Sequence, residues 1–106
     1  MRLDRIEKQE AVLVDVISCM SHPELNDTSL TCTTIDVSET GMKVAIAMSI
    51  PVSTRLGLRL DVASHLYRLE GEVRWSLDED EHCVGLLIDD GSADIVAWTR
   101  MFELDL

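Results

Sequence analysis

The sequence predicts an all-β fold that ends in one helix. Apolar and polar residues alternate along several short segments, as they do in strands with one buried face. The period changes to that of a helix only near the C-terminal end. Pro, Gly, Asn and Asp separate the segments at a spacing that suits a β-barrel or a sandwich. With 106 residues, 46% of them hydrophobic, the chain is expected to form one domain around one core.

Six strands are expected in chain order. The first two segments are rich in β-branched residues, which favour strands, and the polar segment 21–29 between them is expected to be a loop. The later segments alternate in hydrophobicity, and the last follows an acidic turn. The expected strands are 11–20, 30–37, 42–49, 55–62, 66–76 and 82–89.

The alternation also predicts which side chains face the core. In 55–62, three leucines and a valine share one face, while arginine, glycine and aspartate take the other. The same count along 66–76 places Trp75 on one face with Leu69 and Val73. Trp75 is therefore expected to pack in the core or at the barrel rim.

A single helix is expected over 92–104. Ile95, Trp98, Met101 and Phe102 recur at helical spacing and form one apolar stripe. The polar residues Asp-Asp-Gly-Ser just before the stripe can cap the start of a helix. The stripe is expected to pack on the strands.

Charge excludes several classes of partner. The chain has 20 acidic and 9 basic residues, a net charge of −11, whereas non-specific binding to DNA, RNA or an anionic membrane needs clustered cations. No apolar run approaches the roughly 20 residues of a membrane span, and the N-terminal segment is charged. These features predict a cytoplasmic protein without membrane insertion.

The three cysteines suggest neither a disulfide framework nor a zinc site. Cys19, Cys32 and Cys83 are odd in number, widely spaced and outside any C-x-x-C pair. They are expected to be small buried apolar residues. No metal and no cofactor are predicted.

Two groups of residues could be imagined as catalytic. Ser64 precedes His65, and His82 follows an acidic run that starts at Asp78. Neither lies in a known hydrolase or metal motif, so solvated turns are the simpler interpretation. No enzymatic activity is predicted, and a small hydrolase stays only as a weak alternative.

The segment Asp-Val-Ser-Glu-Thr-Gly joins the second and third expected strands. Asp36 and Ser38 are residue types that cap nearby N–H groups in turns, and Gly41 can supply the positive φ that many hairpins need. A hairpin turn therefore explains these residues by itself. The segment has the spacing D-x-S-x-x-G.

With its context, this motif makes nearly the whole chain resemble the PilZ domain family. The matching parts are D-x-S-x-x-G at 36–41, Gly-Glu-Val-Arg-Trp at 71–75, Val-Gly-Leu-Leu-Ile at 84–88 and the C-terminal helix. The resemblance implies a six-stranded antiparallel barrel plus that helix, and a receptor for the bacterial second messenger cyclic di-GMP. The expected layout is an arm over 1–10, a barrel over 11–89 and the helix over 92–104.

The resemblance also implies the ligand-binding residues. In the family, D-x-S-x-x-G contacts a guanine, and an R-x-x-x-R segment before the first strand binds phosphates and guanine edges. This chain has two residues between Arg2 and Arg5 instead of three, so Met1 takes the first position if Arg5 takes the second. An aromatic face such as that of Trp75 can stack on a base.

Two interpretations of the binding residues follow. The first is a cyclic di-GMP receptor that relays binding to a protein partner; the second is a degenerate adaptor that acts through protein contacts without the ligand. The structural alternatives are a plain turn at 36–41 and ordinary solubilising charges at the N-terminus. The predicted ligand-binding residues are Arg2, Arg5, Asp36, Ser38, Gly41 and Trp75.

Overall fold

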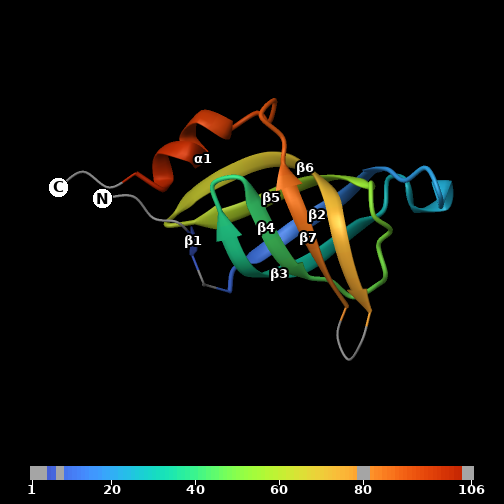
Figure 1. Cartoon of the computed structure of the whole chain (residues 1–106). Coiled ribbons are helices and arrows are strands. Elements are labelled where there is room, and N and C mark those ends of the chain that lie inside the picture. Colours follow the sequence, from blue (N-terminus) through green and yellow to red (C-terminus); the bar gives the residue numbers. More distant parts are fainter. Residues whose placement is uncertain (1–4, 7–8, 79–81, 104–106) are drawn as a thin grey trace.

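A computed structural model describes residues 5–6, 9–78 and 82–103. Every strand pairing is antiparallel, and the sheet order β1-β3-β2-β5-β6-β7-β4 closes on itself through an additional β3–β4 pairing (Figure 1). The predicted barrel of six long strands is thus confirmed, and the two-residue strand β1 is added to it. The strands are β1 Arg5–Ile6, β2 Ala11–Ser18, β3 Ser29–Ser38, β4 Gly41–Ala45, β5 Arg55–Val62, β6 His65–Asp78 and β7 His82–Ile88.

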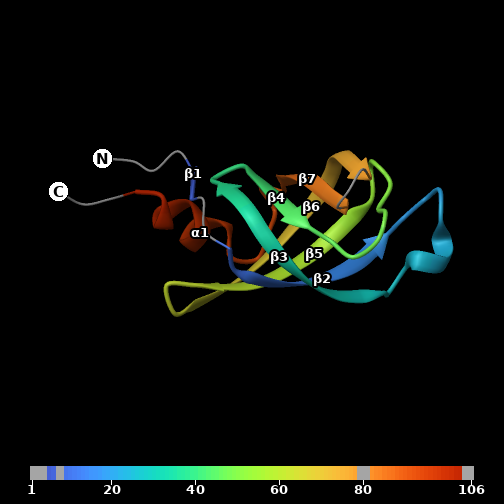
Figure 2. The ribbon, with the colours of Figure 1, turned by 90° about the horizontal axis from the view of Figure 1, so that it is seen from below.

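Two connections differ from the prediction. The loop over 21–29 contains a short 3-10 helix, η1 Pro23–Leu25, at the end of the barrel opposite α1 (Figure 2). The strand predicted over 42–49 ends at Ala45. Ile46 and Ile50 are nevertheless buried, so the apolar spacing persists where the ladder does not. The alternation of apolar and polar residues indicates which side chains are buried, whereas a strand also requires a hydrogen-bonded neighbouring strand.

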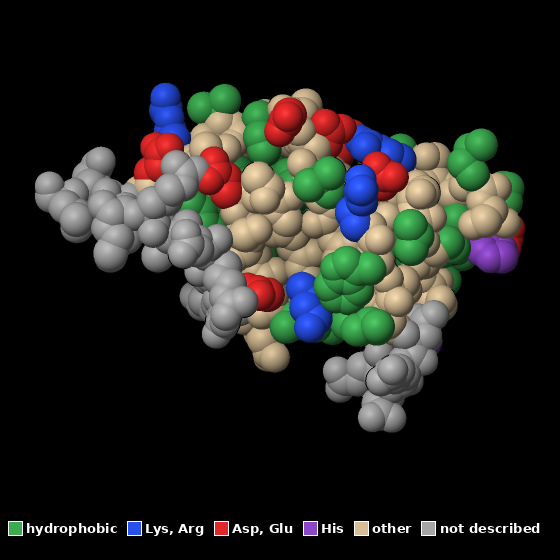
Figure 3. Space-filling model, in the orientation of Figure 1, with side chains coloured by type: hydrophobic (Ala, Val, Ile, Leu, Met, Phe, Trp, Pro, Cys, Tyr) green, Lys and Arg blue, Asp and Glu red, His purple; other side chains and the backbone are tan. Residues whose placement is uncertain are grey.

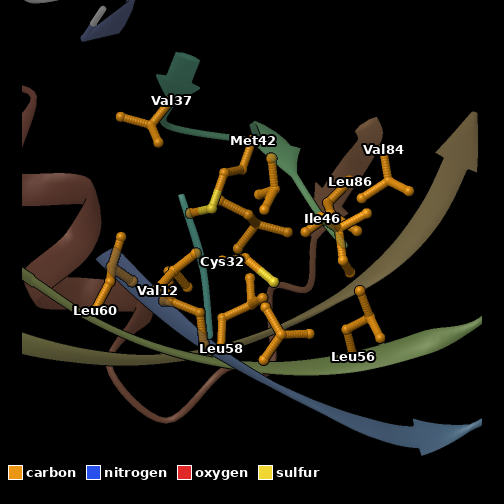
Figure 4. Packing of buried hydrophobic residues seen from close by; sticks show 14 of the residues in the cluster. Val12, Cys32, Val37, Met42, Ile46, Leu56, Leu58, Leu60, Val84 and Leu86 are labelled. Carbon is orange, nitrogen blue, oxygen red and sulfur yellow. The ribbon is translucent and has the colours of Figure 1, made fainter. Parts of the chain in front are cut away.

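The barrel interior is filled by the inward faces of the strands. Figure 4 shows aliphatic side chains, with Met42 and Cys32, pointing at one another from several strands. The alternation predicted for 55–62 is confirmed, since Leu56, Leu58 and Leu60 are buried. All three cysteines are free and buried, as expected of small apolar residues.

Helix α1, Ile95–Met101, lies beside the β5–β6 hairpin at one end of the barrel (Figures 1 and 2). Trp98 and Phe102 are fully buried, and their rings meet edge to face at 5.3 Å. The helix is shorter than the predicted segment 92–104. The polar residues before it do not cap it: the Ser92 hydroxyl accepts the Glu70 N–H, and the Asp94 carboxylate accepts the Arg68 N–H. Among the described residues, no helix is long and apolar enough to cross a membrane.

Two β-bulges on the side of β3, β4, β6 and β7 change which residues face outward, and a third irregularity interrupts the β2–β5 register between Val16 and Ser18. One interrupts the β3–β4 register between Thr34 and Asp36, and the other interrupts β6–β7 between Val73 and Trp75. A bulge adds one residue to one strand, so the inward and outward positions exchange beyond it. The predicted inward position of Trp75 is therefore wrong: Val73 is buried, but Trp75 is 40% exposed.

Candidate functional site

A cleft of about 450 Å³ lies on the outer face of the barrel, where β3, β4, β7 and the end of β6 meet. Figure 3 shows Lys or Arg side chains beside exposed hydrophobic ones on this face. The cleft brings together four predicted site residues: Asp36, Ser38 and Gly41 from the motif turn, and Trp75 from β6. Its other lining residues are Val37, Thr40, Met42, Lys43, Arg74, Gly85, Leu86 and Leu87.

Strand register explains why these residues meet. Asp36 is the partner of Lys43 across β3 and β4, and Lys43 is the partner of Gly85 across β4 and β7. Gly85 is in turn the partner of Trp75 on β6. Directly opposed residues lie about 5 Å apart, so the four form one row across four strands. In β3 and in β6 the extra residue of the bulge comes just before this row. The side chains of Asp36 and Trp75 therefore point outward from the barrel.

The turn at one end of the cleft is held from three directions. Within it, the Ser38 hydroxyl accepts the Gly41 N–H at 3.0 Å. From β7, the Ile88 N–H donates to the Thr40 carbonyl at 2.9 Å. From α1, the Trp98 indole N–H donates to the Glu39 carbonyl at 3.1 Å. The motif is thus a closed hairpin turn and a cleft wall at once.

The structure favours glycine at position 41 because of close packing and not because of a positive φ. The sequence suggested a positive φ, but this glycine does not have one. A Cβ at Gly41 would instead lie 3.2 Å from the Leu86 carbonyl oxygen and 3.5 Å from the Ser38 hydroxyl. The absence of a side chain lets β4 lie close to β7 and leaves room for the hydroxyl of Ser38.

The Trp75 indole lies directly over Gly85, its partner across β6 and β7. A Cβ at Gly85 would come within 2.1 Å of the indole ring, so only glycine permits this contact. Trp75 keeps 40% of its surface exposed, and the Lys43 Nζ lies 5.8 Å from the ring centroid. That distance falls within the range of a cation–π contact. The indole is therefore a supported and partly open aromatic surface.

The cleft also holds cations that the sequence did not single out. Lys43 and Arg74 both line it, and among the described residues that line it Asp36 is the one carboxylate. Alternation with Met42 and Val44 could have shown that Lys43 faces outward. Its position beside Trp75 depends on register and a bulge, which the sequence does not display. The same holds for Gly85.

The N-terminal arginines are only partly described. Arg5 lies in β1, where its backbone pairs with Ser38, so β1 runs beside the motif turn. The described part of Arg5 is its backbone, and Arg2 lies outside the described residues.

The two imagined catalytic groups receive no support from the structure. Ala63 and Ser64 have positive φ and form the tip of the β5–β6 hairpin, with His65 paired to Val62 just beyond it. The ring of His65 packs against that of Tyr67, with 4.5 Å between the two ring centroids. Of the acidic run 78–82, residues 79–81 lie outside the described residues. Within the described part of the chain, no cluster of His, Cys, Asp and Glu could hold a metal ion.

Comparison with known proteins agrees with this geometry. The PilZ domain family matches residues 14–99, which is most of the chain. No curated protein sequence matches it.

Solved structures similar to the chain share its fold at low sequence identity. The Bacillus subtilis inhibitor of motility MotI/DgrA has a TM-score of 0.70 at 14% identity over 95% of this chain, which spans only 48% of that protein. The PilZ domain of CeSA from a cellulose-synthesizing bacterium has a TM-score of 0.62 at 16% identity, over 92% of this chain and 93% of that one.

A third similar structure is the PilZ domain of YcgR from Escherichia coli with c-di-GMP. Its TM-score is 0.63 at 10% identity, over 96% of this chain and 88% of that one. The closed six-stranded barrel, the C-terminal helix and the family match over residues 14–99 lead to one conclusion. The chain belongs to the PilZ domain family.

Proposed function

We propose that this chain is a cyclic di-GMP receptor that passes the binding event to a protein partner and catalyses no reaction. The observation that carries this proposal is the cleft that contains Asp36, Ser38, Gly41 and Trp75 together. The YcgR domain, whose fold is similar, was solved with c-di-GMP. The residues proposed to bind are these four with Arg5 and Arg2.

The chemistry of the cleft suits a guanine nucleotide. The carboxylate of Asp36 can accept hydrogen bonds from the N1–H and amino group of a guanine, and the indole of Trp75 offers a face on which a base can stack. An arginine at position 5 would match phosphate oxygens or the guanine O6/N7 edge with its planar fork. Ser38 contributes mainly by closing the turn, because its hydroxyl already bonds Gly41.

A route from the cleft to a partner runs through α1. The indole of Trp98 is fully buried and donates to the Glu39 carbonyl in the motif turn. A ligand that shifts this turn would therefore change the hydrogen bond that joins it to the helix. Val96 on the same helix is 63% exposed and could meet a partner. We propose α1 as the output element.

One observation favours a second candidate. The N-terminal segment lacks the R-x-x-x-R spacing of the family, and losing one bidentate arginine costs about 1–3 kcal/mol. A chain weakened in this way could serve as an adaptor that contacts its protein partner without the ligand. The two candidates differ in one measurable property, the affinity for cyclic di-GMP.

Isothermal titration with cyclic di-GMP tests the proposal. The parent chain should bind, and Asp36→Ala should weaken binding by roughly tenfold or more because it removes a charged hydrogen-bond acceptor. Asp61→Ala is the matched control, since Asp61 is exposed on β5 and outside the cleft. A parent chain that gives no heat and no NMR shifts would favour the adaptor.

A further inference from the structure

We propose that Lys43 and Arg74, carried by the sheet, hold the phosphates of the ligand in this chain. The inference rests on the proposed function and adds two binding residues outside the D-x-S-x-x-G motif and the N-terminal arginines. Both side chains line the cleft, one from β4 and one from the bulge of β6.

The first argument is the ion pairing of the basic residues. On the hairpin side of the barrel, Arg55 contacts Asp89 at 2.6 Å, Arg59 contacts Asp15 at 2.9 Å, and Arg68 contacts Asp94 at 3.1 Å. Within the described part of the chain, neither cation of the cleft forms such a pair. With 20 acidic residues in the chain, this leaves the cleft as a place where positive charge is available to an anion.

The second argument is the position of these cations around the indole. The Lys43 Nζ lies 5.8 Å from the Trp75 ring centroid, and Arg74 is the residue directly before Trp75. In a nucleotide the phosphate is separated from the base by one sugar. A base stacked on the open part of Trp75 would therefore bring its phosphate into the same cleft that Lys43 and Arg74 line.

The third argument is electrostatic. A net charge of −11 repels a ligand with two phosphates, so local cations must offset the field of the whole chain. If Met1 occupies the first arginine position of the family motif, the N-terminal segment has lost one phosphate contact. Among the described residues that line the cleft, the two cations Lys43 and Arg74 face one carboxylate, that of Asp36. They supply the missing charge from the strands that form the cleft.

Calorimetric titration with cyclic di-GMP tests this assignment in the full chain. The variants are Lys43→Gln, Arg74→Gln, their combination, and Lys43→Arg, each checked for an unchanged thermal midpoint. Arg100→Gln is the matched control, because it removes the same charge from an exposed position outside the cleft. Each variant is measured at low and at physiological ionic strength.

Each single glutamine substitution should weaken binding roughly tenfold, as expected for a lost charge-assisted hydrogen bond. The combined variant should weaken it further and flatten the salt dependence, while Lys43→Arg and Arg100→Gln should stay near the parent. If the parent binds and both glutamine variants match Arg100→Gln, the assignment is overturned and the proposed receptor function stands. If the parent itself does not bind, both fail.

Discussion

The β5–β6 hairpin and the bulged part of the barrel present different outer surfaces. In the hairpin the β5–β6 pairing is uninterrupted from Arg55 with Glu72 to Val62 with His65. The outward arginines of this region, Arg55, Arg59 and Arg68, each contact a carboxylate. On the other side, β3 and β6 carry bulges, and the outward row contains a carboxylate, a lysine, a glycine and an indole. One surface is neutralised by its own ion pairs, and the other is shaped as a cleft.

This comparison indicates that the β5–β6 hairpin mainly stabilises the barrel, whereas the bulged strands mainly form the binding surface. In regular strands, the alternation of apolar and charged residues is sufficient to fill the core on one face and to place the ion pairs on the other. A bulge costs regular pairing but turns chosen side chains outward, which is why bulges are common next to binding sites. Mutations in the two regions should therefore affect different properties.

The two tryptophans give the largest expected contrast. Trp98→Ala should lower the free energy of unfolding by about 3–5 kcal/mol, because a fully buried aromatic side chain and its bond to Glu39 are lost. Trp75→Ala should cost less, about 2 kcal/mol, since the residue keeps 40% of its surface exposed in the folded chain. The same change should weaken cyclic di-GMP binding by roughly 5- to 150-fold through lost base stacking.

Urea unfolding and calorimetric titration measure both effects. Equal losses of stability in the two variants would show that Trp75 is part of the core. Unchanged binding in Trp75→Ala would remove this ring from the proposed site.

Two glycines provide a second and smaller contrast. A Cβ at Gly71 would lie 2.9 Å from the backbone oxygen of Leu87, which cannot move freely, so Gly71→Ala should destabilise by about 1–3 kcal/mol. The nearest atoms to a Cβ at Gly85 belong to the side chain of Trp75, at 2.1 Å. Gly85→Ala should displace that ring and weaken binding with little loss of stability. A reversed order of thermal midpoints would contradict this comparison.

The regular part of the fold could be predicted from the sequence because burial follows alternation there. Leu56, Leu58 and Leu60 show this on β5, and the spacing of Trp98 and Phe102 shows it for the helix. The family resemblance supplied the closed barrel, where alternation alone left a barrel or a sandwich open. Strand ends were less certain, because burial continues past Ala45 without hydrogen-bonded pairing.

The cleft could be predicted only in part. The motif at 36–41 is local in sequence, so its spacing indicated a turn with possible binding groups. The side on which Trp75 lies depends on one extra residue at a bulge, and counting by two cannot detect it. The contact between Trp98 and Glu39 joins residues 59 positions apart, and no local pattern encodes such a separation.

Acid titration should act mainly on the ion-paired surface. A hydrogen bond from Ser29 lowers the pKa of Asp15, that from the Gly91 N–H lowers the pKa of Asp89, and that from Arg68 lowers the pKa of Asp94. A lowered pKa in the folded state stabilises the fold above the unfolded value and loses that contribution as pH falls below about 4. Stability should therefore decrease in this acidic range.

The urea midpoint measured against pH checks this, with salt expected to reduce the effect because the pairs are exposed. Asp94→Asn should make the acid decrease shallower and leave cyclic di-GMP binding unchanged. A steeper decrease in that variant would show that the Arg68 pair does not stabilise the folded state.

The smallest expected effect belongs to Gly57 on the regular surface. A Cβ there would lie 3.6 Å from the Ile17 Cδ1, an ordinary contact, and its φ is not positive. Gly57→Ala should therefore raise the free energy of unfolding by about 0.4–1 kcal/mol, because alanine restricts the unfolded chain without straining the strand. Binding should not change, since Gly57 lies outside the cleft. The variant is the control for Gly85→Ala, and weaker ligand binding in it would show that the hairpin and the cleft are not energetically separate.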